Sequence, residues 1–260
     1  MDVTSTVPPG DSVPRASPTG RAPTLLSPAA RRDARRRMLL LRSAAVERVA
    51  RLAGASPSAV APIRRELRSS DLPDLLLDRG AGPAYARELP QGALLYLLVR
   101  LLRPARVLET GVRPGYSTAW ILAGLEANRF GELTSLGPGP TEGRGRGVAD
   151  VTVGQMVAPR LRSRWTLVLG NTEERLRALL DGGDRIDLFL YDNGPDPHRA
   201  ALELRWAWTA LSARGVLLAH HVDAHPAWTD FCRAQGVLPQ ILDPGPPPLG
   251  ALGMATDRRP

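Results

Sequence analysis

The stretch Arg106-Val107-Leu108-Glu109-Thr110-Gly111-Val112-Arg113-Pro114-Gly115 decides the fold of this chain. It begins with a short apolar run typical of a buried strand, passes two glycines, and is followed by a helical pattern over Tyr116–Ala127. A strand, a glycine-containing turn and a helix form the first half of a βαβ unit, in which glycine lets a ligand approach the backbone. Glu109, at the end of the strand, can accept hydrogen bonds from an amino or hydroxyl group.

Strand-like runs alternate with helical patterns after this unit. The runs are Glu132–Leu136, Trp165–Leu169, Ile186–Tyr191 and Gly215–Ala219, and two more short strands are expected between Val237 and Pro260. This alternation predicts an α/β fold with a doubly wound, mostly parallel, seven-stranded Rossmann-like sheet. Ligands of such sheets bind beyond the carboxyl ends of the strands. One crevice should therefore be bordered by Glu109, Gly137, Gly170-Asn171, Asp192 and His220-His221.

Three regions are predicted along the chain. Residues 1–30 are rich in Pro, Ser, Thr and Gly and are expected to be a disordered tail. Residues 31–103 show apolar positions three or four apart, which predicts an N-terminal helical extension that acts as a cap or an oligomerisation layer, so a homo-oligomer is one expected assembly. Residues 104–260 are expected to form the Rossmann-like core.

The composition narrows the range of partners and compartments. All 34 cationic residues are arginine and the formal net charge is +8, but the arginines are spread along the chain and aromatic residues make up only 5%. This pattern argues against a nucleic-acid partner. The single cysteine, Cys232, excludes an intramolecular disulfide, and neither a membrane span nor a signal peptide is recognisable. A cytoplasmic protein without membrane association is expected.

Several segments in the same order resemble a known family. Leu95–Arg100, Val107–Val112, Ile186–Asp192 and Gly215–Leu218 are similar to segments of bacterial class I S-adenosylmethionine (SAM) methyltransferases of the small O-methyltransferase type, and the likeness spans about residues 35–233. The resemblance implies SAM as cofactor and a small-molecule substrate. The cofactor contacts that it implies are Glu109, Thr110, Gly111, Gly115, Ser117, Gly137, Asn171, Thr172 and Asp192.

The sequence departs from the family pattern where the strands end. Gly137 stands where the family usually has an acid for the ribose hydroxyls, and Asn171 follows Gly170 where an aspartate is usual. After the fifth strand, His220-His221 replaces a frequent pair of aspartates, whereas Asp192 after the fourth strand is retained.

The histidines leave three interpretations open. His198, His220, His221 and His225 are the only histidines, and all follow the fourth or fifth strand. His220 or His221, with His225 and Asp192, would form a site for a divalent transition metal (Fe, Zn or Ni) rather than Mg²⁺, because imidazole prefers these ions. Alternatively, His221, His220 or Asp192 is the catalytic base that deprotonates a substrate hydroxyl. In the third interpretation the histidines only line the pocket.

The sequence as a whole therefore predicts a SAM-dependent methyltransferase that acts on a hydroxyl of a small molecule, such as a specialised metabolite or a sugar. One alternative is a protein of the same fold that uses the Asp/His metal site for oxidation or hydrolysis. Another is a non-catalytic relative, since a fold alone does not fix a function.

Overall fold

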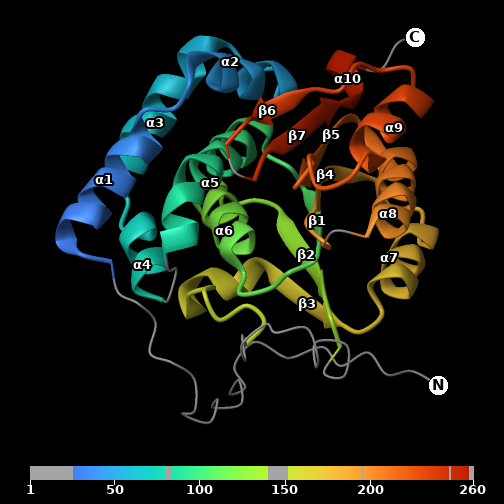
Figure 1. Cartoon of the computed structure of the whole chain (residues 1–260), viewed down its shortest axis with the longest axis horizontal. Coiled ribbons are helices and arrows are strands. Elements are labelled where there is room, and N and C mark those ends of the chain that lie inside the picture. Colours follow the sequence, from blue (N-terminus) through green and yellow to red (C-terminus); the bar gives the residue numbers. More distant parts are fainter. Residues whose placement is uncertain (1–25, 80–82, 140–151, 195, 246, 258–260) are drawn as a thin grey trace.

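A seven-stranded sheet forms the centre of the protein in the computed structural model, which describes residues 26–79, 83–139, 152–194, 196–245 and 247–257 (Figure 1). The strand order is β3-β2-β1-β4-β5-β7-β6. The strands are β1 Arg106–Thr110, β2 Glu132–Gly137, β3 Trp165–Leu169, β4 Ile186–Tyr191, β5 Leu211–His220, β6 Ile241–Asp243 and β7 Leu249–Gly253. The first five run parallel, and β7 is antiparallel to both β5 and β6. The predicted doubly wound, mostly parallel sheet is thereby confirmed.

The register of the parallel strands brings their carboxyl ends to one edge. Thr110 at the end of β1 is paired with Leu136 of β2 and with Tyr191 of β4, and Tyr191 is paired with Ala219 of β5. The residues that follow these strands therefore share one edge of the sheet, as the sequence predicted.

Helices cover both faces of the sheet (Figure 1). Three helices pack on one face of the sheet: α7 Thr172–Asp181, α8 Pro197–Ala210 and α9 Ala227–Ala234. The strand residues that contribute to this core include Phe189 and Leu217. Two helices, α5 Pro83–Leu102 and α6 Tyr116–Asn128, pack on the other face. Leu188 and Leu190 of β4 contribute to that core. Successive residues of β4 thus enter opposite cores, as the period of a strand requires. The short helix α10, Met254–Asp257, follows β7.

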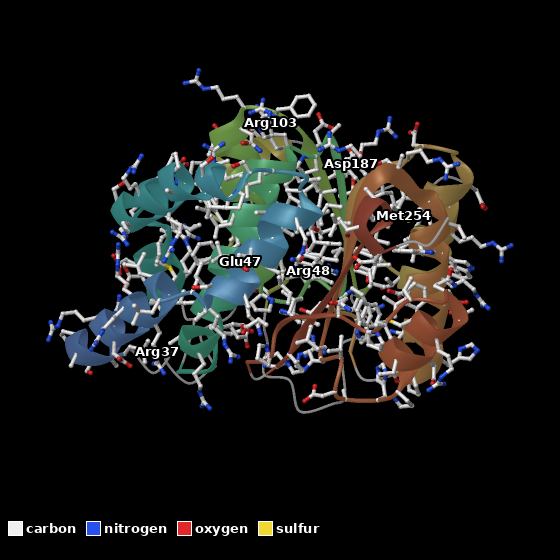
Figure 2. All side chains as sticks on the ribbon, turned by 90° about the horizontal axis from the view of Figure 1, so that it is seen from above. Arg37, Glu47, Arg48, Arg103, Asp187 and Met254 are labelled. Carbon is white, nitrogen blue, oxygen red and sulfur yellow. The ribbon has the colours of Figure 1, made fainter. Side chains whose placement is uncertain are left out.

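The N-terminal helices extend the core on the α5 side. They are α1 Pro28–Leu39, α2 Ser43–Leu52, α3 Val60–Ser69 and α4 Leu72–Asp78; the 3₁₀ turns Pro57–Ala59 and Pro159–Arg164 are labelled η1 and η2. Met38, Leu67 and Leu95 belong to the same buried cluster as Leu190 of the sheet. Arg48 of α2, which Figure 2 labels, also donates to Asp257 of α10 at 2.6 Å. The helical extension and the sheet therefore share one hydrophobic core.

The first helix begins inside the predicted tail. Ser27 caps α1 by accepting from the backbone N–H of Ala30 at 3.2 Å, and Pro28 stands in the first turn, where its missing N–H costs nothing. The predicted boundary at residue 30 is therefore too late, and residues 1–25 of the predicted tail lie outside the described residues. Among the described residues, no helix combines the length and the apolar character that crossing a membrane requires.

Candidate active site

The glycine turn after β1 joins three strand ends. The Gly111 N–H donates to the Leu136 carbonyl at 2.9 Å, and the Asp192 N–H donates to the Thr110 carbonyl at 2.9 Å. Gly111 has a φ of +88°, and a Cβ there would lie 2.1 Å from the Asp192 carbonyl oxygen. The sequence suggested that Gly111 leaves room for a cofactor, but the neighbour that requires glycine here is the backbone after β4. Gly115, also at positive φ, precedes the first turn of α6.

Glu109 is a wholly buried carboxyl whose oxygens have protein donors. Its Oε2 accepts from the Thr118 and Ser135 hydroxyls at 2.7 Å each, and its Oε1 accepts from the Ser117 hydroxyl at 2.5 Å. Burial raises the pKa of Glu109, and the three hydroxyls oppose this rise. Glu109 and Ser117, both predicted cofactor ligands, are thus bonded to each other and tie the first turn of α6 to β1 and β2.

The predicted ribose and adenine positions lie at the ends of β2 and β3. A Cβ at Gly137 would lie 2.8 Å from Val112 Cγ1, so Val112 fills the place where a side chain would begin. Asn171 caps α7, because its Oδ1 accepts from the N–H groups of Glu173 and Glu174 at 3.0 and 3.2 Å. The next residue, Thr172, is buried. The cofactor contacts predicted for these three positions remain predictions.

His220 and Asp192 form the polar centre of the crevice. Nδ1 of His220 lies 3.5 Å from Oδ2 of Asp192, and the imidazole is 6% exposed. Its Nε2 is buried and has no hydrogen-bond partner among the described residues. Burial opposes protonation of His220, but the Asp192 carboxylate, with further help from Glu88, raises its pKa overall. The structure therefore supplies an oriented imidazole with one nitrogen left for another group.

The other histidines are placed differently. His221 has a φ of +55° and is exposed, and its ring centre lies 5.9 Å from that of His220 at 83°. Burial is the main cause that lowers the pKa of His221. His225 Nδ1 accepts from the Ala227 N–H at 3.3 Å at the start of α9, and His198 is exposed on α8.

The predicted metal site is not assembled. The part of the chain that the structure describes includes Asp192, His220, His221 and His225, yet it contains no group of three or more His, Cys, Asp or Glu side chains that could hold a metal ion. The chain turns into the left-handed region at His221, directly after β5, and the His221 ring meets the His220 ring edge to face. The expected set of Asp192, His225 and one of His220 and His221 is therefore not gathered among the described residues.

Two residues of α5 that were not predicted from the sequence lie next to the site. Glu88 is half-buried, and its carboxyl has no hydrogen bond or ion pair with any described residue. Burial raises the pKa of Glu88 to about 7, His220 opposes the rise, and the Asp192 carboxylate adds to it. The Tyr85 ring packs on the Tyr116 ring with centroids 5.2 Å apart. A lone acid within the apolar pattern of α5 was the only sequence signal for Glu88.

A second buried carboxyl supports the segment after β4 from behind. Asn193 Nδ2 donates to Glu203 Oε1 of α8 at 2.6 Å. Burial raises the pKa of Glu203, and the neighbouring Thr110 and Asn193 side chains oppose this rise. This bond fixes the residue next to Asp192, so the position of the Asp192 carboxylate depends on α8 as well as on β4.

Residues 108–222 match the family described as "Methyltransferase domain". None of the curated proteins matches the chain significantly in sequence.

Solved structures with the same fold include three cofactor complexes. The cofactor-bound Rv0187 protein from MTB is 20% identical, with 72% of this chain and 91% of that chain covered and a TM-score of 0.53. An O-methyltransferase from Bacillus cereus in complex with SAH is 18% identical, with coverage of 71% and 91% and a TM-score of 0.52. The O-methyltransferase TomG from Streptomyces achromogenes, in complex with SAM, is 20% identical, with coverage of 68% and 88% and a TM-score of 0.53.

These comparisons confirm the resemblance that the sequence indicated. Residues 108–222 match a methyltransferase-domain family, and the described part of the chain has the fold of the class I methyltransferase structures.

Proposed function

We propose that the protein is a SAM-dependent O-methyltransferase of a small molecule, with His220 as general base and Asp192 as the residue that orients it. The observation that carries this proposal is the buried His220 imidazole, with Nδ1 facing Asp192 and Nε2 without a partner among the described residues. The methyltransferase domain over residues 108–222 supports the reaction class. The O-methyltransferases of the same fold that contain SAM or SAH support the cofactor.

The residues at the strand ends fit SAM. The turn from Gly111 to Gly115 presents backbone with few side chains at the start of α6, and Asp192 places negative charge beside His220. When bound, SAM supplies a methyl group on a positively charged sulfur. Among the predicted contacts we retain Thr110, Gly111, Gly115 and Asp192 as the residues that border it, and we assign Glu109 and Ser117 to bracing the turn.

Proton transfer follows from the arrangement of His220. With Nδ1–H directed at Asp192, the neutral imidazole presents the lone pair of Nε2, which takes the proton of a substrate hydroxyl. The Asp192 carboxylate then stabilises the imidazolium, and the same charge raises the pKa of His220 in the free protein. His221 is exposed whereas His220 is buried against Asp192, so we assign the proton to His220 and narrow the predicted catalytic set to His220 and Asp192.

We keep two finer expectations as part of the proposal: a specialised metabolite or a sugar as acceptor, and a cytoplasmic location. The proposal includes no metal ion, because the described residues do not bring together three His, Cys, Asp or Glu side chains that could bind one.

The experiment is methyl transfer from methyl-labelled SAM to a panel of small hydroxyl compounds, with EDTA present. His220→Asn should lower the rate about 10²–10⁴-fold, the usual contribution of a general base, while SAM affinity stays within a few-fold. His198→Asn changes an exposed histidine and is the matched control. Full activity of His220→Asn would refute the assignment of the base, and activity that EDTA abolishes and Fe, Zn or Ni restores would revive the metal-dependent alternative.

A further inference from the structure

The first turns of α5 present an acid and an aromatic ring to the crevice. Tyr85 and Glu88 are three residues apart, so they lie on one face of the helix. Glu88 interacts electrostatically with His220 and Asp192, and its charge also acts on the Tyr85 and Tyr116 hydroxyls. The Tyr85 ring packs on Tyr116 at the start of α6, and His220 faces Asp192, so Glu88 lies near the ends of β4 and β5.

Among the described acids of the N-terminal helices, the Glu88 carboxyl is the half-buried one without a partner; Glu47 of α2 also has none, but it is exposed. Asp71, Asp74 and Asp78 each form an ion pair with an arginine, and Glu66 is paired with Arg100. Glu88 is half-buried and has neither an ion pair nor a hydrogen bond with any residue in the described ranges. A buried carboxylate is costly unless a cation or donors compensate it, so this position suits a cation that comes from outside the chain.

Two aromatic rings pack on each other next to Glu88. The Tyr85 and Tyr116 rings lie 5.2 Å apart at 30°, and Tyr116 is buried with a hydroxyl that has no hydrogen-bond partner among the described residues. Aromatic faces attract cations, most strongly where water is excluded. A carboxylate beside two such rings is a combination that favours an ammonium or sulfonium group over a neutral or anionic one.

We propose that Glu88, Tyr85 and Tyr116, together with Asp192, form a subsite for a positively charged group beside His220. This inference deepens the proposed function and rests on it for the identity of the reaction. The cation is either the sulfonium of SAM or an ammonium group on the acceptor molecule. The first source gives Glu88 a role in cofactor binding, and the second makes the acceptor an amino-hydroxy compound.

Two binding measurements distinguish the sources. SAM and SAH differ at the sulfur, which is positively charged only in SAM, so their affinity ratio measured by calorimetry reports on the sulfonium. Benzylamine, benzyl alcohol and benzoate differ mainly in charge, and they are titrated with and without saturating SAH. Glu88→Gln keeps the size of the side chain and removes its charge. Glu47→Gln, an exposed change on α2 close to Arg48, is the matched control (Figure 2).

If the cation is the sulfonium, Glu88→Gln should reduce the preference for SAM over SAH about tenfold, and Glu47→Gln should leave it unchanged. If the cation belongs to the acceptor, wild-type protein should bind benzylamine at least about tenfold more tightly than benzyl alcohol and benzoate, and Glu88→Gln should abolish that preference. Tyr85→Leu, which keeps Glu88, should weaken the same interaction several-fold.

The proposal is overturned if Glu88→Gln and Tyr85→Leu, both folded by circular dichroism, change neither the SAM to SAH ratio nor the binding of benzylamine. Failure of the proposed function gives a different result, since neither SAM nor SAH would then bind to wild-type protein. The benzylamine titration without cofactor still tests the subsite in that case.

Discussion

Glu109 and Glu88 both place a carboxyl at the strand-end crevice, but they differ in their hydrogen-bond partners. Glu109 is wholly buried and accepts from three hydroxyls that belong to α6 and β2. Glu88 comes from α5, is half-buried, and has no hydrogen bond with the described residues. An acid with all its partners supplied by the protein braces the turn, whereas an acid without partners retains its capacity for a ligand. Residue type and location alone do not separate these two roles; hydrogen-bond satisfaction does.

The largest loss of stability is expected from a substitution in the backbone of the turn that Glu109 braces. Gly111→Ala places a Cβ 2.1 Å from the Asp192 carbonyl and forces alanine to a φ of +88°. We expect a loss of more than about 3 kcal/mol in unfolding free energy and loss of measurable SAM binding, because the ends of β1 and β4 must separate. Urea unfolding and calorimetry measure the two quantities.

A second glycine at positive φ serves as a control, because alanine there adds the strain of the backbone angle without a steric clash. Gly183 has a φ of +78°, but nothing lies within 4 Å of a Cβ added there. Gly183→Ala should therefore cost only about 1–2 kcal/mol and leave SAM binding intact. Equal effects of the two substitutions would show that the contact between Gly111 and Asp192 is unimportant.

An intermediate effect is expected at Glu109. Glu109→Gln replaces an oxygen acceptor by an amide donor that faces hydroxyl donors, so at least one of Thr118, Ser135 and Ser117 loses its bond. We expect a loss of about 2 kcal/mol in unfolding free energy, within the range for hydrogen bonds to a charged group. Glu132→Gln, at the exposed start of β2, is the control and should change stability by less than about 0.5 kcal/mol. A Glu109→Gln variant as stable as wild type would contradict the bracing role.

The smallest effect concerns Glu88 and depends on pH. Its pKa is about 7 in the folded protein against 4.5 for the free side chain, so between these values the folded state holds the extra proton and stability falls as pH rises. Glu88→Gln removes this loss. The shift corresponds to at most about 3 kcal/mol, which solvent screening of the half-buried carboxyl reduces to about 1 kcal/mol. The variant should therefore gain about 3 °C in melting temperature relative to wild type between about pH 5 and about pH 8, since about 1 kcal/mol shifts a chain of this size by about 2–4 °C. A relative melting temperature independent of pH would indicate that a partner already compensates Glu88.

The sheet was predictable from the sequence because its signals are local. The runs around Val107, Leu188 and Leu217 each carry the apolar pattern of a buried strand, and the order of strands and helices then limits the topology. Asp192 and His220 were predicted at the crevice for the same reason, since Asp192 directly follows β4 and His220 ends β5, and the carboxyl ends of these strands share an edge.

The roles of several site residues were not predictable, because they depend on contacts distant in sequence. Glu88 meets His220 only through the packing of α5 against the sheet, across more than half of the chain. Asn171 and His225 were predicted as ligands, and the structure adds that Asn171 caps α7 and that His225 accepts from the Ala227 N–H, since the side-chain atoms that bind a cofactor or metal also accept backbone N–H groups. Gly111 stays a predicted cofactor contact, and its close approach to the Asp192 backbone was not predictable from the sequence.

The central claim is that the strand-end crevice with His220 and Asp192 binds SAM. Isothermal titration of SAM into wild-type protein and into folded His220→Asn tests it most directly. The account predicts one SAM per chain in both proteins, with affinities within a few-fold of each other, because His220 acts on the substrate proton rather than on the cofactor. An absence of binding heat at several temperatures, with wild-type protein shown to be folded, would contradict the account.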